Sequence, residues 1–94
     1  MPLNSKLCKI LCEVVKIPAS PNVDWNDVER LLTMLGSKVH RTKSGMRSDF
    51  GNGVIWISHR PHPKPLMDKG AVHDLRTHLQ IAGHPPAMYG CKCS

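Results

Sequence analysis

Histidines and cations alternate with prolines in one segment of this chain, His59-Arg60-Pro61-His62-Pro63-Lys64-Pro65. Because proline fixes its own φ and disfavours helix at the residue before it, we expect this segment to be extended. Imidazoles can transfer protons at neutral pH, and guanidinium and ammonium groups can bind phosphate. These residue types at this spacing predict a phosphate-binding segment with two candidate acid–base groups, His59 and His62.

Metal-free cleavage of RNA needs groups of these kinds. A base takes the proton of the ribose 2′-hydroxyl, an acid protonates the leaving oxygen, and cations neutralise the charge that develops on the phosphate. In an extended run with three residues per turn, His59 and His62 would point the same way, roughly 9 Å apart, and could converge on one phosphate. His40, expected beside Arg47, is a third candidate. The alternatives are that His59 ends a strand on its buried side and that His62 only shapes the loop.

Positive charge is concentrated in the middle of the chain. Residues 38–69 hold seven Lys and Arg against two acids, whereas residues 1–37 hold four of each and residues 70–94 hold two against one. This distribution predicts a nucleic acid or an acidic protein as partner, although a cationic surface kept for solubility is the alternative. The residues expected to bind RNA are Lys38, Arg41, Lys43, Arg47, Trp56, Arg60, Lys64 and Lys69. Trp56 could stack on a base or anchor a protein interface instead.

Hydrophobic periodicity predicts the elements that position these residues. Helical spacing indicates a helix over residues 5–16, a second between Asp24 and Gly36, and a third over residues 69–82. The expected capping residues are Asn4 or Ser5, Asp24 and Asp68 at the N-terminal ends, and Gly36 and Gly83 at the C-terminal ends. Period-two patterns predict antiparallel strands over residues 37–42, 46–50 and 54–59.

Asn52-Gly53 is a strong signal for a two-residue type I′ turn, and it sets the expected register of the last two strands. That register pairs Phe50 with Ile55 and Ser48 with Ile57. The face expected to be buried then carries Met46, Phe50, Ile55 and Ile57, and the open face carries Lys38, His40, Arg47, Asp49 and Trp56.

The element order predicts an α+β domain, a three-stranded antiparallel sheet with helices on one face. We expect an N-terminal helix and linker over residues 1–22, the main domain over residues 23–83, and a loosely ordered tail over residues 84–94. No secretory signal or membrane span is evident, so a cytoplasmic location without a membrane partner is expected.

The four cysteines are expected to be reduced thiols in that location. Cys8 and Cys12, one helical turn apart, are interpreted as small core residues. Cys91 and Cys93 could join them and His84 in a zinc site, but the spacing is not typical of one. We expect no metal and no other cofactor.

Several of these motifs together resemble one family, the HicA toxins of bacterial toxin–antitoxin pairs. The resemblance covers about two thirds of the chain, from Trp25 to Gly83, and it is carried by Leu35-Gly36, Gly45-Met46-Arg47, the His59–Pro63 run, Asp68-Lys69-Gly70-Ala71-Val72 and Ala82-Gly83. It implies the α-β-β-β-α fold of double-stranded-RNA-binding domains, here with an extra N-terminal helix. It also implies an mRNA-cleaving endoribonuclease that works without a metal and is blocked by a HicB-type antitoxin, acidic where it docks.

The chain departs from the common pattern of that family at one position. Many members carry Gly-Ser-His at the start of the second strand, and that histidine is catalytic, whereas this chain has Gly45-Met46-Arg47. The branch that it most resembles tends to have arginine there. The alternative function is therefore a non-catalytic RNA-binding or antitoxin-binding module of the same fold.

Overall fold

Three α-helices and a three-stranded antiparallel sheet form an α+β fold in the part of the chain that the structure describes, in the order expected. The computed structural model describes residues 3–16, 23–51, 53–59 and 66–93. Its elements are α1 (Ser5–Val15), α2 (Trp25–Met34), β1 (Lys38–Arg41), β2 (Gly45–Asp49), β3 (Ile55–His59), α3 (Lys69–Ala82) and the 3-10 helix η1 (Pro86–Tyr89). The strand order is β1-β2-β3, so β2 is the central strand.

Side-chain caps begin the helices where the sequence predicts them. Asn4 Oδ1 accepts a hydrogen bond from Leu7 N at 2.8 Å, Asp24 accepts from Asn26 N at 2.7 Å, and Asp68 accepts from Ala71 N at 2.7 Å. Each cap satisfies an amide that has no partner inside the helix. At the other end of α3, Gly83 adopts the left-handed conformation with φ of 81°, which glycine adopts without steric cost.

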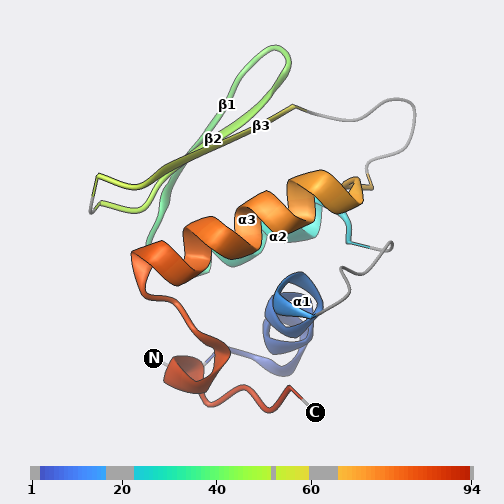
Figure 1. Cartoon of the computed structure of the whole chain (residues 1–94), viewed down its shortest axis with the longest axis vertical. Coiled ribbons are helices and arrows are strands. Elements are labelled where there is room, and N and C mark those ends of the chain that lie inside the picture. Colours follow the sequence, from blue (N-terminus) through green and yellow to red (C-terminus); the bar gives the residue numbers. More distant parts are fainter. Residues whose placement is uncertain (1–2, 17–22, 52, 60–65, 94) are drawn as a thin grey trace.

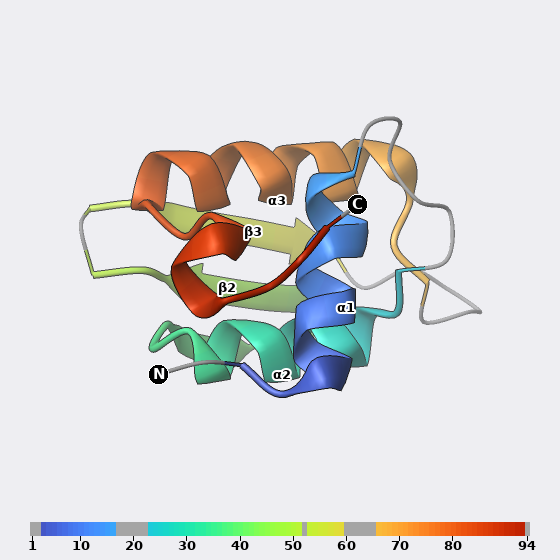
Figure 2. The ribbon, with the colours of Figure 1, turned by 90° about the horizontal axis from the view of Figure 1, so that it is seen from below.

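The elements stack in three layers (Figure 1). The sheet is the first layer, α2 and α3 cover one of its faces, and α1 packs against both helices on the side away from the sheet. Seen from that side, α1 crosses the helix pair and the C-terminal segment with η1 runs beside it (Figure 2). The hydrophobic core fills the interface between the sheet and the helix pair α2 and α3, and the interface between that pair and α1. Its most completely buried large side chains are Trp25, Trp56, Leu11, Leu31, Leu32, Met46, Leu75 and Leu79.

The register of the β2–β3 hairpin differs by one residue from the prediction. Phe50 N donates to Val54 O, and Ser48 pairs with Trp56. The turn therefore spans residues 51–53, and Gly51 and Gly53 both have positive φ, 87° and 78°. Because successive side chains of a strand point to opposite faces, this shift by one residue exchanges the buried and open faces of β3. The side chains of β1 and β2 point to the faces that were expected. Trp56 is 1% exposed, whereas Ile57, predicted to be buried, is 64% exposed.

The C-terminal tail also differs from expectation. It contains η1, and disulfides join Cys8 to Cys91 and Cys12 to Cys93. The prediction of a loosely ordered tail and of free thiols was wrong, since two covalent links hold the tail on α1. Cys8 and Cys12 are partly buried next to the core and do not act as isolated apolar side chains.

Candidate nucleic-acid interface

The face of the sheet opposite α2 and α3, here called the open face, gathers half of the candidate functional residues that the structure describes, among them both described candidate histidines. In the described part of the chain no helix packs on it (Figure 1). The strand register places seven side chains there: Lys38, His40, Arg47, Asp49, Ile55, Ile57 and His59. All are exposed except Asp49, which is half-buried. The open face therefore presents two imidazoles and two cations to solvent, with one carboxylate and two isoleucines among them.

Arg47 lies at the centre of this face. It is on the middle strand, directly opposite His40 on β1 and Ile57 on β3. Side chains at directly opposite positions have Cβ atoms about 5 Å apart, so the guanidinium and the His40 imidazole can reach one phosphate group. The planar guanidinium can donate two parallel hydrogen bonds to that phosphate.

His59 ends β3 on the same face, opposite Gly45. It is exposed, so the alternative that it ends the strand on the buried side was wrong. From the spacing of strands and the rise per residue, the Cα atoms of His40 and His59 are about 12 Å apart. The imidazoles of His40 and His59 can therefore both reach a substrate that is placed between them, next to Arg47.

Gly45 allows the two strands to approach closely at this end of the sheet. A Cβ atom at this position would lie 1.8 Å from the carbonyl oxygen of Ser58 and 2.9 Å from the Cα of His59. No side chain fits there. The glycine of the Gly45-Met46-Arg47 motif therefore permits the close pairing of β2 with β3 that places His59 on the open face.

Two residues expected to bind RNA lie elsewhere. Trp56 points into the core between the sheet and the helices, so it cannot stack on a base at the open face. Arg41 is on the covered side of β1, where its guanidinium pairs with Glu29 of α2 (Nη2 to Oε1, 2.9 Å) and lies 5.5 Å from the centre of the Trp25 ring. The hydrogen bond and the charge of Glu29 raise the pKa of Arg41. The predicted RNA contact of Trp56 was wrong, because its side chain is buried. The Arg41 side chain remains 55% exposed beside Glu29, so its contact with RNA stays a prediction.

The remaining candidates are divided between the edges of the fold and the part outside the described residues. Lys43 is exposed in the β1–β2 turn, at the same end of the sheet as His59, and Lys69 is exposed at the start of α3 in the helix layer. Arg60, His62 and Lys64 lie outside the described residues. The structure therefore brings together Lys38, His40, Arg47 and His59, with Lys43 nearby.

Ile55 and Ile57 are on the open face, although the register predicted from the sequence puts both on the buried face. They are 37% and 64% exposed, beside Asp49 and Arg47 respectively. The size of the Trp56 side chain could have indicated this orientation from the sequence. An indole buries a larger apolar area than either isoleucine, which favours the orientation of β3 that buries Trp56.

Comparisons with protein-family models, with curated proteins and with solved structures found no match to this chain. In the part of the chain that the structure describes, no helix has both the length and the apolar character that crossing a membrane requires.

Proposed function

We propose that this protein is a HicA-like toxin that binds mRNA with its open face and cleaves it without a metal. The observation that carries the proposal is the exposure of His40, Arg47 and His59 together on the uncovered side of the sheet. The order α2-β1-β2-β3-α3 is consistent with a double-stranded-RNA-binding-domain-like core to which α1 is added. A cytoplasmic location, where mRNA is available, belongs to the same proposal.

The proposed chemistry assigns different tasks to the arginine and the imidazoles. Arg47 holds the scissile phosphate and neutralises its developing charge, because a guanidinium does not release its proton at any useful pH. One imidazole, of His40 or His59, takes the proton of the 2′-hydroxyl, and the 2′-oxygen attacks phosphorus. The 5′-oxygen leaves with a proton from the other imidazole, and the product carries a 2′,3′-cyclic phosphate. His62, from the proline-rich segment, is a further candidate for either proton transfer.

A HicB-type antitoxin is the proposed protein partner. Ile57 lies directly opposite Arg47, and Ile55 lies opposite Asp49, whose partner on β1 is Lys38. An antitoxin with apolar anchors for the two isoleucines and a carboxylate for Arg47 fits that combination. By covering the open face it would exclude RNA.

The second candidate function is an RNA-binding module without nuclease activity. It is favoured by one observation, the arginine at the centre of the open face in the position where many HicA toxins carry their catalytic histidine. In that case RNA affinity is retained and turnover is lost.

Cleavage of a labelled RNA by the purified protein in EDTA tests the proposal. His40→Ala, His59→Ala and Arg47→Ala variants are compared with His73→Ala, a matched control because His73 is an exposed histidine on α3. We expect cleavage by the wild type and His73→Ala, and loss in at least one open-face histidine variant. RNA binding without cleavage, weakened mainly in Arg47→Ala, would overturn the nuclease and support the binding module.

A further inference from the structure

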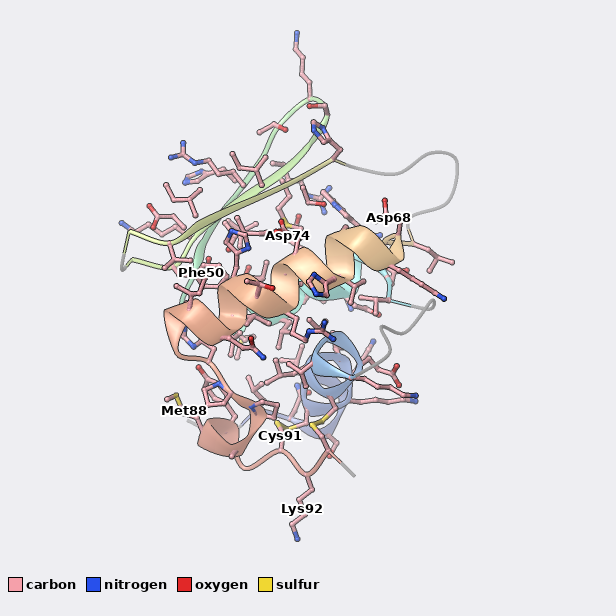
Figure 3. The ribbon with its side chains drawn as sticks, in the orientation of Figure 1. Phe50, Asp68, Asp74, Met88, Cys91 and Lys92 are labelled. Carbon is pink, nitrogen blue, oxygen red and sulfur yellow. A yellow bond between two sulfur atoms is a disulfide. The ribbon has the colours of Figure 1, made fainter. Side chains whose placement is uncertain are left out.

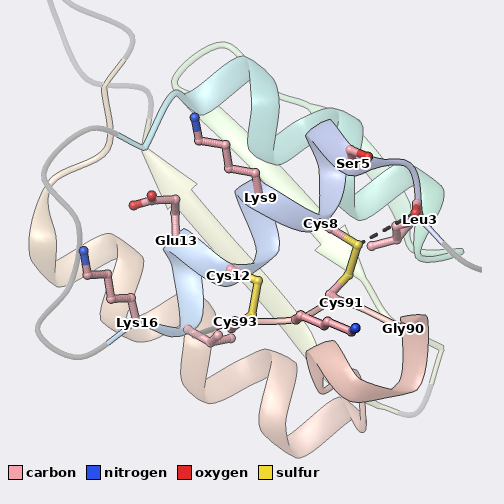
Figure 4. A pocket seen from close by; sticks show the side chains of 12 residues that line it. Leu3, Ser5, Cys8, Lys9, Cys12, Glu13, Lys16, Gly90, Cys91 and Cys93 are labelled. Atoms are coloured by element: carbon pink, nitrogen blue, oxygen red, sulfur yellow. Dashed lines mark hydrogen bonds between the residues drawn. A yellow bond between two sulfur atoms is a disulfide. The ribbon is translucent and has the colours of Figure 1, made fainter.

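Four cysteines from the two ends of the chain meet on the side of the molecule away from the open face (Figure 4). Cys8 and Cys12 lie one turn apart on α1, and Cys91 and Cys93 follow η1 in the tail. Each α1 cysteine faces one tail cysteine, with a Cα–Cα distance of 5.3 Å in both pairs. All four line one surface pocket, here called the cysteine pocket.

We propose that the reduced form of this cluster is a structural site for zinc or a similar thiophilic divalent cation, bound by all four thiolates. A tetrahedral zinc–sulfur site has bonds of about 2.3 Å and therefore sulfur–sulfur distances of about 3.8 Å. The Cα separation within each pair permits sulfur atoms at that distance once the disulfide is open. The two pairs are about 5–6 Å apart, the spacing of neighbouring turns on one helix face, so side-chain rotation can bring them together.

The spacing in sequence supports the half of the site that lies on α1. Cys8-x-x-x-Cys12 falls within the two to four intervening residues common in zinc sites, and α1 fixes both side chains on one face. Cys91-x-Cys93 supplies the other two ligands from the tail. With the sulfurs joined in pairs, the described residues hold no group of ligand side chains arranged for a metal ion, so the site requires the reduced protein.

The charges around the cysteine pocket fit the metal complex. Binding of one zinc ion to four thiols releases four protons and leaves a complex with a charge of −2. Three cations and one acid line the same pocket: Lys9, Lys16, Lys92 and Glu13. Their net charge of +2 balances the complex, and a positive environment favours the thiolate over the thiol.

This site would hold the tail on α1 in a reducing compartment, where disulfides do not persist. With four protein ligands and no open position, it would be structural and would not take part in chemistry at the open face. The inference goes beyond the proposed function and does not depend on it.

Cobalt binding to the reduced full-length protein tests the proposal, because tetrahedral cobalt–thiolate complexes absorb in the visible range. The protein is reduced with a phosphine, separated from the reductant without oxygen, and titrated with Co²⁺ and then with Zn²⁺. We expect one Co²⁺ per chain with the spectrum of four thiolate ligands, displaced by Zn²⁺. The oxidised protein is expected to bind none.

Two variants separate this site from other ligand sets. Cys91→Ser/Cys93→Ser should abolish the four-thiolate spectrum while circular dichroism shows that the helices persist. His84→Gln should bind Co²⁺ like the wild type, because His84 hydrogen-bonds to Tyr89 and is not in the cysteine pocket. Absence of cobalt binding by the reduced wild type, or a spectrum unchanged in the Cys91→Ser/Cys93→Ser variant, would overturn the proposal.

Discussion

At the scale of single residues, Arg47 determines what the centre of the open face can do. Its guanidinium keeps its proton, so it contributes charge and hydrogen-bond geometry and leaves proton transfer to its neighbours. His40 is directly opposite, and His59 lies at the end of the next strand. In the proposed nuclease, these three residues would therefore share the work of binding the phosphate and transferring protons.

Arg47→Ala should weaken RNA binding by roughly 10- to 100-fold, because a hydrogen bond to a charged group contributes about 1.5–3 kcal/mol. The dependence of affinity on salt should also fall by about one phosphate contact. Arg47→Lys should restore the salt dependence but only part of the affinity, since lysine keeps the charge and loses the paired donors. Titrations of a labelled RNA at several salt concentrations measure both quantities. Unchanged affinity in Arg47→Ala would contradict a phosphate contact.

His84 is a residue whose protonation is expected to affect the stability of the fold. Its Nδ1 hydrogen-bonds to the Tyr89 hydroxyl, and its ring centroid lies 5.7 Å from that of Phe50, a labelled core side chain in Figure 3. Partial burial lowers the pKa of His84, so the folded protein binds this proton less readily than the unfolded chain does.

The free energy of unfolding should therefore decrease as the pH falls from about 6.5, the ordinary pKa of histidine, through the lowered pKa of the folded state. Above that window the His84 contribution is complete. His84→Gln should reduce this part of the pH dependence, and His73→Gln, an exposed histidine on α3, should leave it unchanged. Denaturant unfolding at a series of pH values measures the effect, and identical pH profiles for wild type and His84→Gln would refute it.

At the scale of elements, the β2–β3 hairpin determines which side chains face RNA or a protein partner. Three residues form its turn, and Asp49 Oδ1 accepts a hydrogen bond from Gly51 N at 2.8 Å. This turn is one residue longer than the predicted turn. As a result, Trp56 points into the core, and Ile55 and Ile57 point to the open face.

Trp56→Ala should lower the free energy of unfolding by about 3–5 kcal/mol, because it removes a buried aromatic side chain from the core. Ile57→Ala should change it by no more than about 0.5 kcal/mol, since that side chain is largely exposed. The two-residue turn would predict the opposite order. Denaturant unfolding of the two variants therefore distinguishes the registers directly.

Features set by local interactions could be predicted from the sequence, and those set by tertiary contacts could not. Asp24 and Asp68 cap α2 and α3 as predicted because a cap depends on a few neighbouring residues. The turn was misjudged because Asn52-Gly53 is a strong local signal, while burial of Trp56 between sheet and helices is decided across the whole fold. His40 and Arg47 were placed correctly because the error was confined to the strand after the turn.

At the scale of the whole molecule, two disulfides join α1, the layer farthest from the sheet, to the C-terminal tail. The disulfides span 83 and 81 residues, and no local pattern indicates that α1 and the tail meet. Cysteine spacing alone therefore could not reveal the pairing, which depends on how α1 lies across α2 and α3.

Reduction of the protein in EDTA should lower the free energy of unfolding by about 2–4 kcal/mol, the usual contribution of cross-links that close long loops. RNA binding should be unaffected below the unfolding transition, because the cysteine pocket and the open face are on opposite sides of the helix pair. Parallel unfolding and RNA-binding measurements on oxidised and reduced protein check both statements. A loss of RNA affinity in the reduced, folded protein would contradict the independence of the two sides.

The same connection has a consequence for biosynthesis. The partners of the first helix, Cys91 and Cys93, follow all the helices and strands of the described residues in sequence. During translation, α1 can pack on α2 and α3 only after those helices emerge, and it cannot be linked to the tail until Cys91 and Cys93 emerge. A message cut between the codons for Gly83 and Cys91 would therefore yield a chain that has the open-face residues of all three strands but lacks both disulfides between α1 and the tail.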